Sequence, residues 1–277
     1  MVYLILSALF FAFNNILWKW VVAVHLPLQV IVKRSIITSL IGGVVLIFNY
    51  DDLLFYNTIQ QFAFVNLTCV IGALGLVFMV YGIKQSSLSM FIHYSLLGAI
   101  VTASYLYFVE NIIPKNYAIG TLCLSLGFFV FLRNQRHDIK KINISTHRYL
   151  FIMSMCFSAN GIMQWYNLKT YDIVFLAVHQ ELTVLIIAAF LLYFLKQSPM
   201  VFFKLDYITV MALLVFAAVI TGMYGLKTTN PFIASIVSLT SSIFTMILAV
   251  YVLKERFRWS YIISMFMVIF GAWLLGQ

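Results

Sequence analysis

The sequence predicts an all-α integral membrane protein with ten transmembrane helices, arranged as two inverted five-helix repeats. Three observations lead to this fold class. First, the 277 residues are 64% hydrophobic and 9% charged, with a mean hydropathy of +1.02, whereas about 25% of residues are charged in soluble domains. Second, the apolar runs have the length of about 20 residues that a helix needs to cross a bilayer. Third, polar landmarks recur at nearly constant spacing along the chain.

Ten apolar runs separated by turn signals are the predicted helices. They cover residues 2–23, 27–49, 60–83, 87–109, 115–133, 148–168, 173–195, 205–225, 231–253 and 259–276. All four prolines fall at junctions between these runs, where a fixed φ angle and a missing N–H are tolerated. Strands of a membrane barrel would need alternating segments of about ten residues. Residues 1–18 carry no Lys or Arg, so the first run is expected to be a retained helix and not a signal peptide.

The two halves of the chain repeat each other. Landmarks recur 143 to 146 positions apart: Asn14 with Asn160, the tetrad at 81–84 with that at 224–227, and Glu110 with Glu255. Each half then holds five helices, and an odd number makes the second copy enter the membrane from the opposite face. We expect a first repeat at residues 1–133, a basic connecting loop at 134–147 and a second repeat at 148–277.

Ionisable residues inside a membrane are costly and usually face a cavity or a partner. Arg34 lies about 10 Å from one face and Glu181 about 12 Å from the other at 1.5 Å per residue, so the two can meet in a core about 30 Å thick. We predict that they form a central charged pair. The alternative is that Arg34 reaches the interface beside Lys33 while Glu181 pairs with His179. His93 and His179 are candidates for a proton relay or for satisfied interior histidines.

Polar residues also recur at matching positions in both halves. Asn14 and Trp18 stand four residues apart in the first predicted helix, and Asn160 and Gln164 repeat this spacing in the sixth. Residues i and i+4 share a helix face, so the stripe is predicted to line a substrate cavity. Polar side chains can instead join helices by hydrogen bonds, and that alternative stays open.

Several repeated residues have an architectural explanation. Glu110 and Glu255 lie at helix ends near basic residues, where a cap or an ion pair is the simpler interpretation. In the tetrads at 81–84 and 224–227, we expect an interfacial tyrosine, a glycine that eases helix termination and a lysine among lipid headgroups.

The net charge of +9 is best explained by the membrane surface. The basic residues are scattered over loops, with one cluster at 133–148, so anionic headgroups and not nucleic acid are the expected partner. No metal cluster or nucleotide-binding loop is present in the sequence, so we expect no cofactor and no ATP drive. The oligomeric state stays open.

Two segments carry a resemblance to a known family. "ASIVSLTSSIFTMILAVYVLKERFRWSYIISMFMVIFGAWLLG" at 234–276 and the weaker "FVENIIPKNYAIGTLCLSLG" at 108–127 resemble the drug/metabolite transporter superfamily, in its two-repeat EamA branch. The resemblance implies a multi-pass metabolite carrier of the bacterial inner or plasma membrane, with a central cavity open alternately to each side. The chain departs from the family pattern in lacking proline inside the fourth and ninth helices, and in having Gln180 where a second arginine would match Arg34.

The orientation of the chain is open. Loops on one side hold eleven Lys or Arg and loops on the other hold three, which puts both termini outside the cytoplasm under the positive-inside rule. The family resemblance implies termini inside.

The expected function is secondary transport, with export of small polar metabolites such as amino acids. Glu181 could couple transport to protons by changing its protonation when substrate engages Arg34. The alternative is proton-coupled efflux of lipophilic cations, although the first helix lacks the glutamate of such exporters. An intramembrane enzyme is disfavoured, since no G-x-S-x-G occurs and residues 179–181 lack the second histidine of a zinc helix. A non-transporting receptor or scaffold is the third class, and measurement of flux in proteoliposomes separates it from a carrier.

Overall fold

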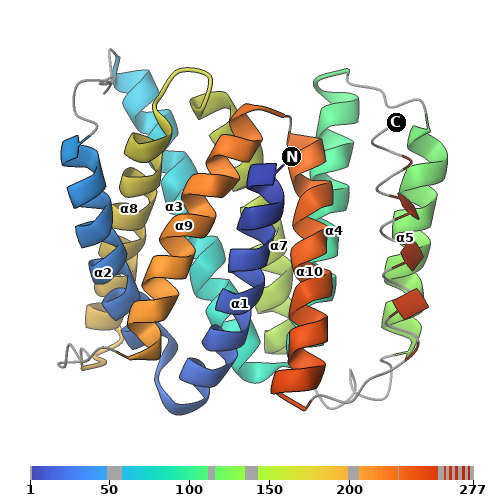
Figure 1. The fold of residues 1–277 in the computed structure, drawn as a ribbon, viewed down its shortest axis with the longest axis horizontal. Coiled ribbons are helices and arrows are strands. Elements are labelled where there is room, and N and C mark those ends of the chain that lie inside the picture. Colours follow the sequence, from blue (N-terminus) through green and yellow to red (C-terminus); the bar gives the residue numbers. More distant parts are fainter. Residues whose placement is uncertain are drawn as a thin grey trace.

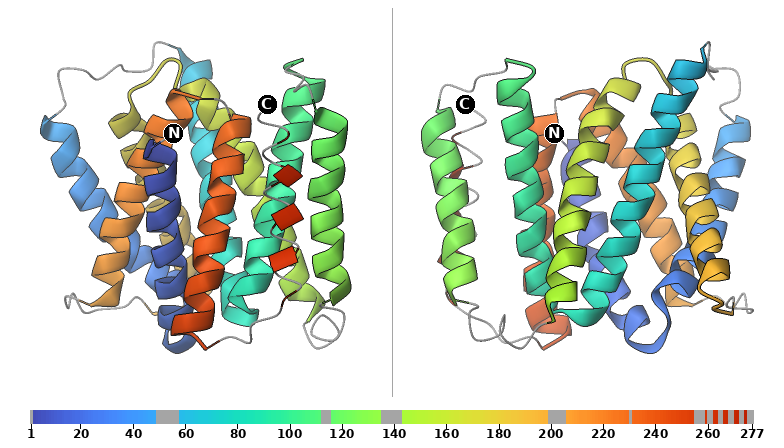
Figure 2. Two further views of the ribbon diagram at one scale, coloured as in Figure 1. Left: turned by 45° about the vertical axis from the view of Figure 1, so that its right-hand side comes forward. Right: turned by 180° about the vertical axis from the view of Figure 1, so that it is seen from behind.

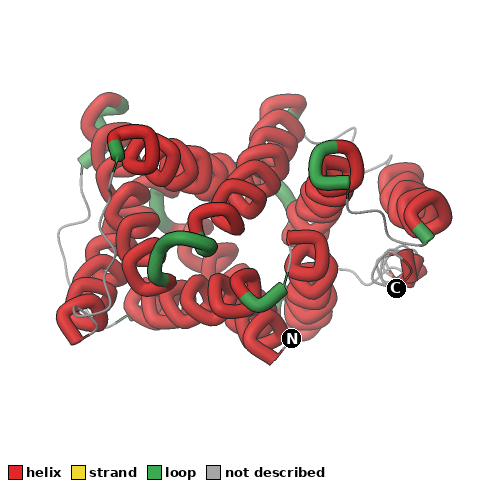
Figure 3. The backbone as a smooth tube through the Cα atoms, turned by 90° about the horizontal axis from the view of Figure 1, so that it is seen from above, coloured by secondary structure: helices red, strands yellow, loops and turns green. Residues whose placement is uncertain are grey.

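The computed structural model is a bundle of long helices joined by short loops (Figures 1 and 3). It describes residues 2–48, 58–111, 116–134, 143–198, 206–229, 231–254 and some positions of 259–274. These residues form nine helices: α1 (Val2–Val24), α2 (Pro27–Phe48), α3 (Ile59–Gln85), α4 (Leu88–Phe108), α5 (Tyr117–Asn134), α7 (Ile144–Asn167), α8 (Ile173–Phe194), α9 (Tyr207–Lys227) and α10 (Pro231–Val252). The tenth expected span, 259–276, lies mostly outside the described residues.

The helix starts follow from local capping chemistry. Asp172 accepts hydrogen bonds from the Val174 and Phe175 amides at the start of α8, and Thr58 accepts one from the Gln61 amide in α3. The expected start of the sixth helix at residue 148 is wrong, because α7 begins at Ile144. The Asn143 side chain caps this start by accepting a hydrogen bond from the Ser145 amide.

Five of the described helices are long and apolar enough to cross a membrane: α1, α2, α3, α8 and α9. The chain is therefore a membrane protein. Many large apolar side chains are exposed on its surface, among them Phe48, Ile59 and Ile186.

Helix pairs recur in the two halves of the bundle. α1 packs on α9 as α7 packs on α3, and α1 packs on α10 as α7 packs on α4, while α2 meets α8 and α4 meets α10. α1 runs downward and α7 upward in Figure 1. α5 lies at one edge, against α4 (Figure 2). The contacts thus follow the pairing that an inverted repeat requires.

The repeated tetrads lie at two of these matched contacts. A Cβ added at Gly82 of α3 would lie 2.5 Å from Leu150 of α7, and one at Gly225 of α9 would lie 2.4 Å from Leu4 of α1. The preceding tyrosines pair in the same way, Tyr81 with Tyr149 and Tyr224 with Tyr3. Both glycines lie inside their helices, so the expectation that they ease helix termination is wrong; they let a neighbouring helix approach closely.

Candidate functional site

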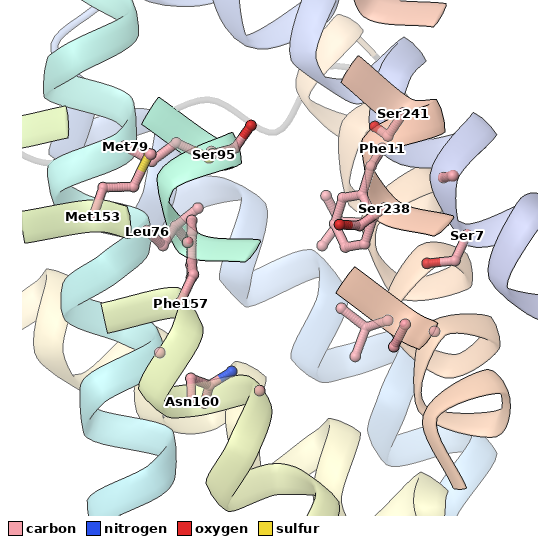
Figure 4. Close-up of a pocket in the computed structure, with 18 of the residues that line it drawn as sticks. Ser7, Phe11, Leu76, Met79, Ser95, Met153, Phe157, Asn160, Ser238 and Ser241 are labelled. Carbon is pink, nitrogen blue, oxygen red and sulfur yellow. The ribbon is translucent and has the colours of Figure 1, made fainter. Parts of the chain in front are cut away.

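A cavity of about 450 Å³ lies in the middle of the bundle. Figure 4 shows side chains of α1 and α10 on one side of it and those of α3, α4 and α7 on the other. Residues of α9 join the first wall, and α2 and α8 contribute Arg34, Gln180, Glu181 and Val184. Each wall therefore combines one helix of one half with two helices of the other.

The cavity extends towards the face where α1 begins. Its lining includes Leu4, Leu226 and Pro231, which lie at the ends of their helices on that face. Towards the other face, the lining of α1 and α3 reaches Trp18 and Met79, roughly two helical turns from the helix ends.

Hydrogen bonds of Lys19 and a cluster of apolar side chains occupy the space beyond Trp18. Lys19 donates hydrogen bonds to the carbonyls of Ile83 and Ser86 at the end of α3, where a cation complements the helix dipole. Val22, Ile83 and Leu150 belong to one fully buried apolar cluster near this end. These contacts close the space between α1, α3 and α7 on the face opposite the start of α1.

Arg34 and Glu181 form a buried ion pair in the cavity wall. Arg34 Nη2 lies 2.8 Å from Glu181 Oε2, and the two side chains are 2% and 3% exposed. The same carboxylate oxygen lies 2.8 Å from Thr38 Oγ1, and Arg34 Nη2 also donates to Ser35 Oγ at 3.0 Å. Breaking such a pair by removing one partner leaves an uncompensated buried charge.

Several buried polar atoms around the cavity have no hydrogen-bond partner among the described residues. Donors of this kind are Trp18 Nε1 and Arg34 Nε, and acceptors are Asn14 Oδ1, Asn160 Oδ1 and Gln180 Oε1. An unpaired buried polar group costs free energy, so these five atoms are unsatisfied hydrogen-bonding capacity in residues that line the cavity.

Gly72 of α3 brings two of these amides together. A Cβ added there would lie 2.8 Å from Asn160 Oδ1 and 2.7 Å from Gln180 Nε2, and Gln180 Nε2 donates to the Cys69 carbonyl at 3.1 Å. Sequence reasoning did not single out Gly72 or Thr38. The i, i+4 spacing of Thr38 after Arg34 was the one available signal.

The predicted site residues divide into two groups. Asn14, Trp18, Arg34, Asn160 and Glu181 line the cavity. The other predicted site residues, Gln164, His179 and His93, are not among its described lining.

Gln164 and His179 make contacts elsewhere. Gln164 Nε2 lies 3.7 Å from Met223 Sδ, between α7 and α9, and is not part of the lining. His179 Nε2 lies 3.2 Å from Asn66 Oδ1 on α3, so it faces that helix and not Glu181. The side chain of His93 lies outside the described residues.

Two further polar contacts join helices at the membrane faces. Glu110 accepts a hydrogen bond from Tyr166 of α7, while the expected basic neighbour of Glu110, like Glu255, lies outside the described residues. Lys33 Nζ donates to Asp206 Oδ2 at 2.6 Å. Partial burial alone would raise the pKa of Asp206, but the bonds from Lys33 and from the backbone amides at the start of α9 lower it overall.

These features define a polytopic membrane protein built around a central cavity with a charged pair in its wall. Residues 145–277 match the EamA-like transporter family. This family belongs to the drug/metabolite transporter superfamily, so the second half of the chain is similar to those transporters.

A known structure shares the fold of this chain. A solved crystal structure superposes with a TM-score of 0.69 at 12% sequence identity, covering 97% of this chain and 95% of the other. At this identity the likeness shows the fold alone. No curated protein matches the chain by sequence.

Proposed function

We propose that the protein is a secondary transporter of small polar metabolites such as amino acids, with export as the expected direction. One observation carries the proposal: the central cavity lies between two walls of matched helices and has a buried ion pair beside unpartnered donors and acceptors. In inverted-repeat transporters the substrate site lies between the repeats, near the middle of the membrane. Access then alternates between the two faces as the walls rock around the site.

The chemistry of the lining favours a substrate with both polar and apolar parts. Arg34 and Glu181 are the charged residues among the described lining, and they compensate each other at 2.8 Å. Unpartnered donors suit a carboxylate, and unpartnered amide oxygens suit an ammonium or hydroxyl group. Phe11 and Phe157 offer apolar surface on opposite walls (Figure 4).

The same geometry weighs against efflux of lipophilic cations. A cation exporter needs a carboxylate that is free to receive the cation, whereas Glu181 is bonded by Arg34 and Thr38. Taking Glu181 from these partners for a hydrophobic cation would leave Arg34 buried and unpaired, which is costly.

Transport by purified protein in proteoliposomes tests the proposal. Labelled L-amino acids and a labelled lipophilic cation are tested one at a time, with an imposed pH gradient and in exchange mode at equal pH. Under the coupling hypothesis, Glu181→Gln abolishes pH-driven uptake and retains exchange, since exchange needs only binding and reorientation.

Glu110→Gln is the matched control, because it makes the same substitution at a carboxylate outside the cavity lining. It should keep both activities. Absence of flux for every probe would overturn the transport proposal. Normal pH-driven uptake by Glu181→Gln would leave a facilitator driven by the substrate gradient alone.

A further inference from the structure

The hydroxyl group of Thr38 stands at the centre of the buried charge cluster, one helical turn after Arg34. Its Oγ1 lies 2.8 Å from Glu181 Oε2, 3.1 Å from the Arg34 carbonyl oxygen and 3.2 Å from the Ser35 carbonyl oxygen. Thr38 itself is fully buried. A threonine hydroxyl has one hydrogen to donate and two lone pairs that can accept, so it can serve only one of these three acceptors at a time.

Because three acceptors lie within reach of the Thr38 hydroxyl, it can form hydrogen bonds with no donor left unpaired in either protonation state of Glu181. When Glu181 is ionised, Thr38 donates its hydrogen to Glu181 Oε2. When Glu181 carries a proton, the carboxylic acid O–H donates to Thr38 Oγ1, and the Thr38 hydrogen turns to the carbonyl oxygen of Arg34 or Ser35. Thr38 neither gains nor loses a proton in this change, and the distances given above serve both arrangements.

We propose that Thr38 is a positioning residue that allows Glu181 to take up and release a proton while buried in the cavity wall. The inference rests on the proposed coupling role of Glu181 and adds the residue that makes it feasible. A protonated carboxylic acid without an acceptor in this site would leave a buried donor unpaired, a cost that Thr38 removes.

The groups around Glu181 fit this assignment. Arg34 faces it from α2. Lys33, the other cation of α2, is bonded to Asp206 at the start of α9, and His179 of α8 faces Asn66 of α3. Cys69 of α3 has a fully buried thiol, and its backbone carbonyl oxygen accepts a hydrogen bond from Gln180 Nε2. On protonation of Glu181 the countercharge of Arg34 has to come from an anion in the cavity, which is a small buffer anion such as chloride when no substrate is present and a substrate carboxylate during transport.

The simpler explanation is that Thr38 bonds only its own helix. Serine and threonine in membrane helices commonly donate to the carbonyl four residues earlier, and Thr68, Thr102 and Thr221 do so here. Thr38 differs from them in having a carboxylate oxygen as its nearest acceptor. An experiment must therefore report on Glu181 itself.

Infrared difference spectra between high and low pH make this test without any substrate. The carbonyl band of a protonated carboxylic acid is assigned to Glu181 by its loss in Glu181→Gln. In Thr38→Val, which removes the hydroxyl and keeps the branched shape, the band should move to higher frequency because the acid O–H has lost its acceptor. Thr38→Ser should keep the wild-type band. An unchanged band in Thr38→Val, or no Glu181 band in the wild type, overturns the proposal.

Transport gives a second readout in the same variants. With the L-amino acid that the wild type carries best, Thr38→Val should lose about tenfold in pH-driven uptake and keep exchange at equal pH, and Thr38→Ser should restore the uptake. Equal losses of uptake and exchange in Thr38→Val would mean a structural role and would overturn the inference. The infrared result stands even if no amino acid is carried, so failure of the proposed function and failure of this inference are distinguishable.

Discussion

Replacement of Arg34 by methionine tests how strongly the buried ion pair holds the bundle together. The change keeps most of the side-chain stem and removes the guanidinium, which leaves Glu181 3% exposed and without its countercharge. Removing one partner of a buried pair costs about 3 to 5 kcal/mol, a large part of the stability of a typical protein. The double variant Arg34→Met with Glu181→Met has no unpaired charge, and such replacements are often neutral or stabilising.

The assay is equilibrium unfolding in mixed micelles with increasing SDS, applied to both single variants, the double variant and the wild type. A double-mutant cycle then isolates the coupling between the two side chains. The matched control is Lys33→Met, because its partner Asp206 has a side chain that is 34% exposed and can be solvated. This variant should lower the free energy of unfolding by less than about 1 kcal/mol. The reasoning is refuted if Arg34→Met lowers the free energy of unfolding by no more than Lys33→Met does. It is also refuted if the double variant lowers the free energy of unfolding by the sum of the two single-variant losses.

Three further predictions concern other parts of the bundle. The pKa of Asp206 is lowered in the folded state, so the carboxylate stabilises the fold fully above its unfolded pKa of about 3.9, and this stabilisation is lost as the pH falls through the folded pKa. Unfolding measured as a function of pH should show this loss of stability. The variant Asp206→Asn should no longer show it. Gly225→Ala should destabilise by about 1 to 3 kcal/mol through overpacking in the same unfolding assay, whereas Gly43→Ala, with open space around it, should be neutral or stabilising. A cysteine at Asn14 should react with small polar thiol reagents, while a cysteine at Gln164, outside the lining, should resist them; equal labelling would contradict the assignment of the wall.

The spacing along the chain predicted which helices of the two halves correspond, and the observed helix contacts follow that pairing. Asn14 and Asn160 are 146 positions apart and both line the cavity. The rise per residue also put Arg34 and Glu181 at similar depths, since a helix that spans a bilayer has a known length and direction. Depth follows from sequence because each residue advances the chain by a fixed distance.

The direction in which each polar side chain points could not be inferred in the same way. Asn160 and Gln164 lie one turn apart on α7, yet only Asn160 lines the cavity. On α8, His179 and Glu181 face different neighbours because two residues turn a helix by about 200°. In a soluble helix the apolar stripe marks the buried face. Here both the lipid side and the interior are apolar, so that signal is missing.

By itself the sequence determined the membrane class, the approximate helix ends and the regular spacing of its polar landmarks, because these depend on composition and on distance along the chain. The tertiary structure alone decided which side chains face the cavity, that Gly82 and Gly225 serve close helix contacts, and that Thr38 meets Glu181. Those features depend on the rotation of each helix about its axis and on which helix lies beside it. Rotation is set by packing of small against large side chains between helices, and packing exists only once the helices have assembled.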